Sequence, residues 1–435
     1  MRIIDGRSAL RLLLVLLLAC PAGRLKEAMA SSAVSPQETV GDEKSLVEAR
    51  RQYEESLRLS DAGQAEAAID LAGRALAMRE KLLGPNHADV AMSLSGLGRL
   101  YADRADFERA DALLARAAEV TARTSGAESL AYADVLHNLA RSKYSQGEHA
   151  LAEQLNEQAL AIRGRLAGPD SLPVASSLQN LAALYRAAND LPKAEQTFLR
   201  VVAMREKLLG PDDVQVSHAL NNLGLLYYAA GDYQLAETTL QRALAIREKV
   251  LGESHAHVAM TLNNLGLVEW KKRDAERAAA YYRRALKIYE TVNGPESDGV
   301  AGIFHNLGIL EKEAGNYSRA EEYYRRALTT WEKIFGENSA STANAVASLG
   351  ILYKAVGDYD RAEGYLLRAN AINEKVLGPY DHYTILSLIS LTRLYAAKGD
   401  VTRAIEYQRR IDAVEEKIVP LNLSVGSERQ KIAYF

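Results

Sequence analysis

Apolar and polar positions follow one another along this chain with the spacing of paired amphipathic helices. The segment over residues 221–254 reads NNLGLLYYAAGDYQLAETTLQRALAIREKVLGES and contains two runs in which apolar residues recur every three to four positions. This spacing places the apolar side chains on one face of each helix. The short polar stretch around Gly231 separates the two runs. The pattern therefore predicts a unit of two helices joined by a tight turn.

The same unit recurs nine times with a strict period of 42 residues and no insertion or deletion. One column of the repeat marks the loop after the second helix, at Gly84, Gly126, Gly168, Gly210, Gly252, Gly294, Gly336, Gly378 and finally Pro420. Another column marks the turn inside each unit, at Gly63, Ala105, Gly147, Asn189, Gly231, Arg273, Gly315, Gly357 and Gly399. Strict periods of this length are typical of solenoids built from stacked helix pairs. We expect an all-α array with no independent domain inside it.

A glycine inside the first helix of the unit predicts a close approach of the two helices. Gly224 stands where glycine costs about 1 kcal/mol relative to alanine, so packing has to compensate. Ala236 and Ala243 on the second helix are small enough to let the two backbones come together. Gly252 then ends the second helix, because glycine adopts the left-handed conformation found at helix C-termini.

These residues carry a resemblance to a known family. The pattern consists of Asn222, Leu223, Gly224 and Tyr227 on the first helix and of Ala236 and Ala243 on the second. It resembles the tetratricopeptide repeat, and its 42-residue length is similar to the form found in kinesin light chains. The resemblance covers residues 45–418. It implies a right-handed superhelix whose concave face, lined by the first helices, holds a segment of a protein partner.

The N-terminal residues 1–30 have the features of an export signal. Arg2, Arg7 and Arg11 precede an apolar run over residues 12–19, which is too short to span a bilayer. Residues 17–20, Leu-Leu-Ala-Cys, resemble a bacterial lipobox that would make Cys20 the lipidated first residue of the mature protein. Residues 28–30, Ala-Met-Ala, fit an ordinary signal peptidase site instead, and an uncleaved start is a third interpretation.

Cysteine content and the signal together suggest the compartment. Cys20 is the only cysteine, so one mature subunit has no disulfide and no thiolate site. Residues 31–44 are rich in Ser, Ala and Glu and are predicted to be a flexible linker or a frayed cap of the array. We expect an exported bacterial protein, either free in the periplasm or anchored to the outer membrane by a lipid on Cys20, which would be its only membrane contact.

Composition and motifs argue against an enzyme. The chain lacks a phosphate-binding glycine loop, a His-Glu-x-x-His motif and a Gly-x-Ser-x-Gly elbow, so neither a catalytic site nor a cofactor is predicted. His255 and His257 lie two residues apart, but nothing nearby completes a metal site, and we interpret them as part of a helix start. The formal net charge of -3 gives no reason to expect a nucleic-acid partner.

An asparagine column is the main candidate for partner binding. It lies two residues before the first-helix glycine of each repeat, at Asn138, Asn180, Asn222, Asn264 and Asn306, and continues as Ser348 and Ser390. Two helical steps turn this side chain about 200° away from the glycine, and so away from the second helix of its own repeat. A row of side-chain amides is able to pair with an extended peptide backbone. The alternative is structural, with the asparagines bonding neighbouring helices.

Cations and aromatic residues on the same helix arc give this face its expected chemistry. The cations are Arg99, Arg141, Arg186, Lys271, Lys312, Lys354 and Arg393, the acids are Asp103, Asp134 and Glu313, and the aromatic residues are Tyr144, Tyr228 and Trp270. Such a surface suits an acidic or aromatic peptide or a free C-terminal carboxylate. The alternative is an ordinary solvated helix face.

The C-terminal residues 419–435 depart from the repeat. Pro420 is predicted to end the last helix. Residues 426–431, Gly-Ser-Glu-Arg-Gln-Lys, resemble the segment that leads into CHAT domains of bacterial tetratricopeptide proteins. This resemblance implies the sensor half of a truncated or split CHAT-type protease system. An assembly factor for envelope complexes is a further alternative to the favoured function, a non-enzymatic scaffold that binds a peptide.

Overall fold

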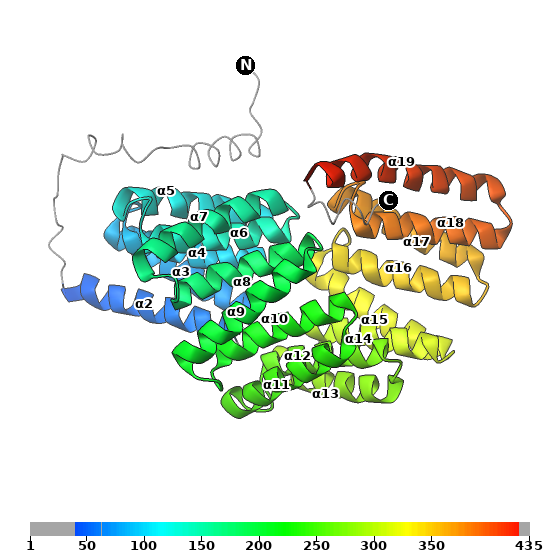
Figure 1. Ribbon diagram of the computed structural model, residues 1–435, viewed down its shortest axis with the longest axis horizontal. Coiled ribbons are helices and arrows are strands. Elements are labelled where there is room, and N and C mark those ends of the chain that lie inside the picture. Colours follow the sequence, from blue (N-terminus) through cyan, green and yellow to red (C-terminus); the bar gives the residue numbers. More distant parts are fainter. Residues whose placement is uncertain (1–39, 62, 426–435) are drawn as a thin grey trace, which may run out of the picture. The chain divides into compact units, whose positions relative to one another are not determined.

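A computed structural model describes residues 40–61 and 63–425, and these residues form only helices (Figure 1). The chain divides into two units, the first ending at Leu226 and the second beginning at Tyr227. Helices up to this boundary are α2 (Val40–Asp61), α3 (Ala65–Leu83), α4 (Ala88–Asp103), α5 (Phe107–Thr124), α6 (Leu130–Ser145), α7 (His149–Ala167), α8 (Leu172–Ala187), α9 (Leu191–Leu209) and α10 (Val214–Ala230), which contains it. The remaining helices are α11 (Tyr233–Leu251), α12 (Ala256–Lys271), α13 (Ala275–Asn293), α14 (Asp298–Glu313), α15 (Tyr317–Phe335), α16 (Ala340–Ala355), α17 (Tyr359–Val376), α18 (His382–Lys398) and α19 (Val401–Val425).

The eighteen helices of the described residues alternate between two roles, as the repeat predicted. We call the even-numbered helices A helices and the odd-numbered ones B helices. Inside each unit an A helix packs on the B helix that follows it, and that B helix packs on the next A helix, as for α14, α15 and α16. Neighbouring A helices also touch, as α4 and α6 do in the first unit and α12 and α14 in the second. The all-α fold of about nine helix pairs is confirmed.

Both turn columns have positive φ, but Gly252, with φ 85° and ψ 155°, is not in the left-handed helical conformation that the sequence predicted. All eight loop glycines have positive φ, for example 92° at Gly210. The inner-turn column does the same even where it lacks glycine, with φ of 59° at Ala105, 58° at Asn189 and 64° at Arg273. A non-glycine residue rarely takes this conformation, so the geometry of the repeat imposes it on these positions.

The glycine inside the A helix makes room for a large side chain of the B helix. A Cβ at Gly266 would lie 2.4 Å from the Tyr282 ring, and one at Gly308 would lie 2.6 Å from the Tyr324 ring. Both tyrosines are buried in the core of the second unit. The sequence predicted a close approach through small residues, and alanines such as Ala278 are indeed fully buried, but the space above the glycine holds an aromatic ring.

Two predicted boundaries are wrong. Helix α2 begins at Val40, inside the stretch that was expected to be a flexible linker. Helix α19 passes through Pro420 and ends at Val425. A proline ring sets φ near the helical value and removes a single backbone donor, so a helix can continue through it at a cost in stability.

Several predictions fall on parts of the chain that the structure does not describe. The export signal with Cys20 lies outside the described residues, as does the segment over residues 426–431. Among the helices that are described, none has the length and apolar character required to cross a membrane.

Candidate peptide-binding face

The asparagine column joins neighbouring A helices. Asn138 on α6 donates from Nδ2 to the Ser95 hydroxyl on α4, at 2.9 Å. Asn306 on α14 donates to Oδ1 of Asn263 on α12, at 2.8 Å. In both cases the acceptor precedes the donor by 43 residues, which is one repeat plus one position. These two amide nitrogens therefore bond neighbouring helices, as the structural alternative for the asparagine column predicted.

Histidines take part in the same ladder at two places. Asn180 on α8 lies 3.0 Å from Nδ1 of His137 on α6. His305 on α14 lies 2.8 Å, through Nε2, from the hydroxyl of Ser348, which occupies the asparagine column on α16. Burial lowers the pKa of His137 to about 3 and that of His305 to about 4, so both rings are neutral near pH 7. Sequence reasoning missed this second polar column, although it directly precedes the asparagine column.

The remaining two asparagines differ in their surroundings. Asn264 is only 7% exposed and has an interaction partner of its own. Asn222 is partly exposed, and its side chain forms no hydrogen bond within the described part of the chain. Asn138, Asn180 and Asn306 also remain partly exposed, so each presents an edge that a ligand can reach. Their use in peptide binding remains a prediction.

Cations on the A helices of the first unit are largely paired within the protein. Arg141 on α6 reaches Asp103 on α4 at 2.6 Å, and Arg99 approaches the same carboxylate at 3.3 Å. Asp134 is bound by the buried Arg163 of α7 at 2.6 Å. Arg186 on α8 is the exception, since it has no ion pair among the residues described. Two of the three cations on this face of the first unit thus have a carboxylate partner, and they share its single negative charge.

The second unit differs, because three cations on its A helices have neither a carboxylate nor an aromatic partner among the described residues. They are Lys312 on α14, Lys354 on α16 and Arg393 on α18, and none forms an ion pair with any described residue. Burial lowers the pKa of Lys354, and the positive charges of Arg393 and Lys312 lower it further. We call these three residues the cation triad. Lys312 and Arg393 therefore each lie close enough to Lys354 for their charges to act on it.

Trp270 and Lys271 form a separate group on the second unit. The Lys271 ammonium lies 4.4 Å from the centre of the Trp270 ring, in a cation-π contact. The Trp270 indole donates from Nε1 to the Glu313 carboxylate at 2.7 Å. Lys271 and Glu313 are therefore already engaged with the same aromatic ring and are less available to a ligand than the sequence suggested.

The two tyrosines of the aromatic column pack against their own repeats. Tyr144 lies 5.3 Å from the His149 ring, and Tyr228 lies 6.0 Å from the Tyr233 ring. Burial raises the pKa of Tyr228. An aliphatic row that sequence reasoning missed accompanies this column, at Leu267, Ile309 and Ile351, all half-buried on A helices of the second unit. Its signal was a 42-residue spacing of aliphatic residues three positions before Trp270, Lys312 and Lys354.

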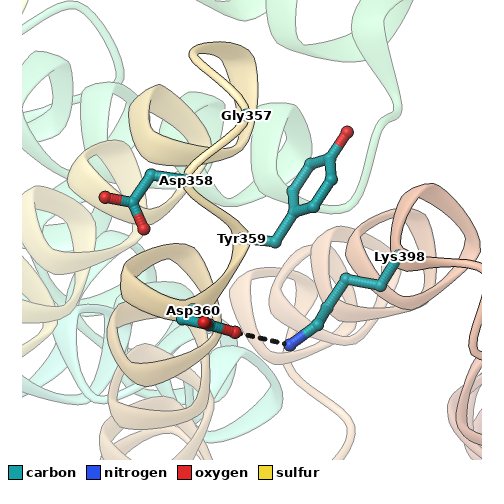
Figure 2. Close-up of a pocket in the computed structure, with 5 residues that line it drawn as sticks. All are labelled: Gly357, Asp358, Tyr359, Asp360 and Lys398. Carbon is teal, nitrogen blue, oxygen red and sulfur yellow. Dashed lines mark hydrogen bonds and ion pairs between the residues drawn. The ribbon is translucent and has the colours of Figure 1, made fainter.

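A pocket and a pair of histidines lie outside the columns described above. Figure 2 shows a pocket of about 440 Å³ at the inner turn of the eighth repeat, lined by Gly357, Asp358, Tyr359, Asp360 and Lys398. The Lys398 ammonium lies 3.0 Å from Asp360 and 2.6 Å from Glu363, so the charges that line it are already paired. No group of three or more His, Cys, Asp or Glu side chains suited to a metal occurs in the described ranges 40–61 and 63–425. His255 and His257 lie at the start of a helix, as predicted. The His255 side chain accepts a hydrogen bond from the backbone N–H of His257 and caps α12.

The family of the chain follows from its sequence and this architecture together. The tetratricopeptide repeat family model matches residues 59–123, 104–165, 132–207, 215–291, 299–374 and 348–411, which is more than half of the chain. The chain belongs to the tetratricopeptide repeat family. This match confirms the resemblance deduced from the repeat columns.

Several solved structures are similar to this chain. A Rap protein complexed with Competence and Sporulation Factor is similar, with a TM-score of 0.60, 15% identity, and 87% of this chain and 99% of that chain covered. The apo form of the quorum sensor NprR from B. thuringiensis gives a TM-score of 0.54 with 11% identity and coverage of 84% and 98%. A putative kinesin light chain repeat protein of Podosopora anserina is 22% identical over 46% of this chain and 95% of that chain, with a TM-score of 0.39. No curated protein matches the chain.

Proposed function

We propose that this tetratricopeptide repeat protein is a non-enzymatic scaffold that holds a peptide segment of a partner protein along its A helices. The observation that carries the proposal is the ladder within each unit, which aligns partly exposed amides from successive repeats in one row. The similar Rap protein was solved in complex with Competence and Sporulation Factor, a precedent for a ligand held by an array of this fold.

In this proposal the asparagine side chains bind the backbone of the peptide, so affinity does not depend strictly on the peptide sequence. An amide that uses its nitrogen within the ladder keeps carbonyl lone pairs that can accept from a peptide N–H. Asn138, Asn180, Asn222, Asn264 and Asn306 would provide such contacts. Arg141, Arg186, Tyr228, Trp270, Lys271, Lys312 and Lys354 would contact the side chains of the segment, acidic or aromatic ones above all.

We propose that the protein is exported, because its N-terminal residues have the features of an export signal. Arg2, Arg7 and Arg11 ahead of an apolar run, followed by Cys20, are typical of bacterial export signals. Replacing Cys20 by serine and following the partition of the protein between membrane and soluble fractions would test the lipid anchor. An unchanged soluble pool would reject it.

The experiment that tests the scaffold is a capture from the native cell envelope. The wild-type chain is compared with a variant in which Asn180, Asn222 and Asn264 are all replaced by alanine. Circular dichroism and thermal unfolding show whether that variant keeps its fold. A matched control carries Asn338→Ala, because Asn338 is exposed and lies in a loop outside the A helices.

Each result of this capture has a defined meaning. A partner retained by the Asn338→Ala control and lost by the folded triple variant supports binding on the A helices. A partner retained equally by all three proteins contradicts it and directs attention to the B helices. The CHAT-type regulator and the envelope assembly factor are distinguished by the identity of the partner, a separately encoded protease domain in the first case and several envelope proteins in the second.

A further inference from the structure

We infer that the second unit selects an acidic segment through the cation triad, with an aliphatic side chain of that segment against the neighbouring isoleucines. This inference rests on the proposed function and deepens it, because it assigns the partner chemistry to one part of the A-helix face. The triad consists of Lys312, Lys354 and Arg393, one residue from each of three successive A helices.

The absence of an internal partner distinguishes the triad from Arg99 and Arg141 of the first unit, and the triad shares it with Arg186. Arg99 and Arg141 share the Asp103 carboxylate, whereas no described carboxylate lies within ion-pair distance of any triad member. Lys312 and Lys354 are half-buried, so part of their hydration is lost without an ion pair in return. Two or more carboxylates on a ligand would restore that balance.

Helix dipoles explain only part of the arrangement. Lys312 and Lys354 lie in the last turns of α14 and α16, where the C-terminal carbonyls favour positive charge. Arg393 lies more than one turn before the end of α18 at Lys398, and the dipole effect fades beyond the last turn. A purely structural role therefore leaves Arg393 and the mutual repulsion of the three cations unexplained.

Aliphatic residues on the same helices indicate which other side chains the bound segment carries. Ile309 and Ile351 stand three positions before Lys312 and Lys354, which places each pair on one helix face. Both isoleucines pack on the core and stay partly exposed. The same column holds Arg393 in the next repeat, so the aliphatic row ends at a cation. A segment with an aliphatic side chain followed by acidic ones matches this order.

A binding measurement with a synthetic probe tests the inference. The probe is a fluorescent peptide of alternating leucine and glutamate, and its matched control has glutamine in place of every glutamate. Fluorescence anisotropy at low and high salt reports the affinity of the full chain for each peptide. The triad variant is Lys354→Gln with Arg393→Gln, and the first-unit control is Arg200→Gln with Lys207→Gln, two exposed cations of the B helix α9.

The expected result is a loss confined to the second unit. We expect the triad variant to bind the acidic probe at least about fivefold more weakly, because two charge-assisted contacts are removed. The first-unit control should change affinity less than about twofold, and Lys354→Arg should retain binding. The glutamine peptide should bind both variants and the wild type equally.

Two results would overturn the inference. One is an equal loss in the triad variant and in the first-unit control, which would reflect net charge only. The other is the absence of salt-sensitive binding of the acidic probe to the wild-type chain. In either case a partner captured from the envelope through the asparagine column would still support the proposed function, so the two failures are distinguishable.

Discussion

The two units carry the same ladder on their A helices but distribute charge over it differently. Asn138 in the first unit and Asn306 in the second each donate to the preceding repeat in the same way. Asp103 pairs with both Arg99 and Arg141 in the first unit, whereas the cation triad of the second unit has no such carboxylate among the described residues. The backbone framework is thus common to both units, and the side chains placed on it determine which ligands each unit favours.

The comparison shows that the position of a charged residue on the A-helix face is by itself a weak guide to whether it binds a ligand. Arg141 and Lys354 were equal candidates in the sequence, since both project from the same arc of an A helix. An acid 38 residues away occupies Arg141, and no acid among the described residues reaches Lys354. Pairing within the protein therefore has to be known before a charged column is interpreted as a binding site.

The largest effect is expected from breaking the framework of the second unit alone. Gly308→Ala would place a Cβ 2.6 Å from the buried Tyr324 ring, so the helix or the ring has to shift. We expect a loss of about 2–3 kcal/mol in the free energy of unfolding. Hydrogen exchange should show faster opening in the second unit and unchanged protection in the first.

A second glycine on the same helix provides the control for that variant. A Cβ added at Gly302 would have no neighbouring atom within 4 Å, so Gly302→Ala meets open space. Alanine is the better helix former, and we expect a gain of about 0.5–1 kcal/mol. Equal stability of the two variants would show that Tyr324 does not require the glycine.

Acidification should weaken the ladder in both units, because each contains a buried histidine. Burial lowers the pKa of His305 from 6.5 to about 4. The unfolded chain therefore binds a proton that the folded chain does not, and stability falls as the pH drops from about 6.5 to about 4. We expect His305→Asn to remove about 2 kcal/mol of this loss.

Asparagine is a reasonable replacement there, since Asn263 occupies the same position one repeat earlier. Unfolding by urea at several pH values would measure the effect, with His382→Asn on an exposed side chain as the control. An identical pH dependence in wild type and His305→Asn would mean that folding leaves the pKa of this ring unchanged.

The sequence predicted the repeated framework well because backbone geometry repeats with it. The loop after each B helix needs a residue with positive φ, and this requirement leaves a visible glycine column such as the one containing Gly210. The site was harder to predict, because its contacts cross from one repeat to the next. The acceptors of the ladder change from Ser95 to His137 to Asn263, so no single residue type identifies them. Helix α19 continued through Pro420 because local preference is one contribution among several.

A smaller stabilisation should follow from removing a buried charge that distinguishes the second unit from the corresponding place in the first. Glu269 on α12 is 0% exposed and faces Glu237, whereas the corresponding Lys143 of the first unit pairs with Asp111 at 2.7 Å. Burial, followed by the charge of Glu237, raises the pKa of Glu269. We expect Glu269→Gln to gain about 1 kcal/mol near neutral pH, since Lys272 and Arg277 keep Glu237 as their partner.

The pH dependence of that gain has a definite sign. A raised folded-state pKa means that the folded protein binds the proton more readily than the unfolded chain does. The cost of ionised Glu269 is therefore present at neutral pH and disappears as the pH falls through its folded-state pKa. Thermal unfolding of both proteins across this range should show the advantage of Glu269→Gln shrinking toward acid. A loss of stability at neutral pH would show that Lys272 and Arg277 need both carboxylates.

The smallest expected effect is also the most direct test of the comparison. Asp103→Asn removes the carboxylate that occupies Arg99 and Arg141, and it should leave two unpaired cations on α4 and α6. Exposed pairs of this kind stabilise the fold by less than about 1 kcal/mol, so the variant should remain folded. The first unit should then bind the leucine-glutamate probe about two- to threefold more tightly, with the gain disappearing at high salt. Anisotropy measured in the Lys354→Gln, Arg393→Gln background would isolate this new binding from that of the triad. If Asp103→Asn leaves the affinity for the probe unchanged, charge pairing does not explain why the two units bind the probe differently. The aliphatic row at Ile309 and Ile351 would then explain the difference.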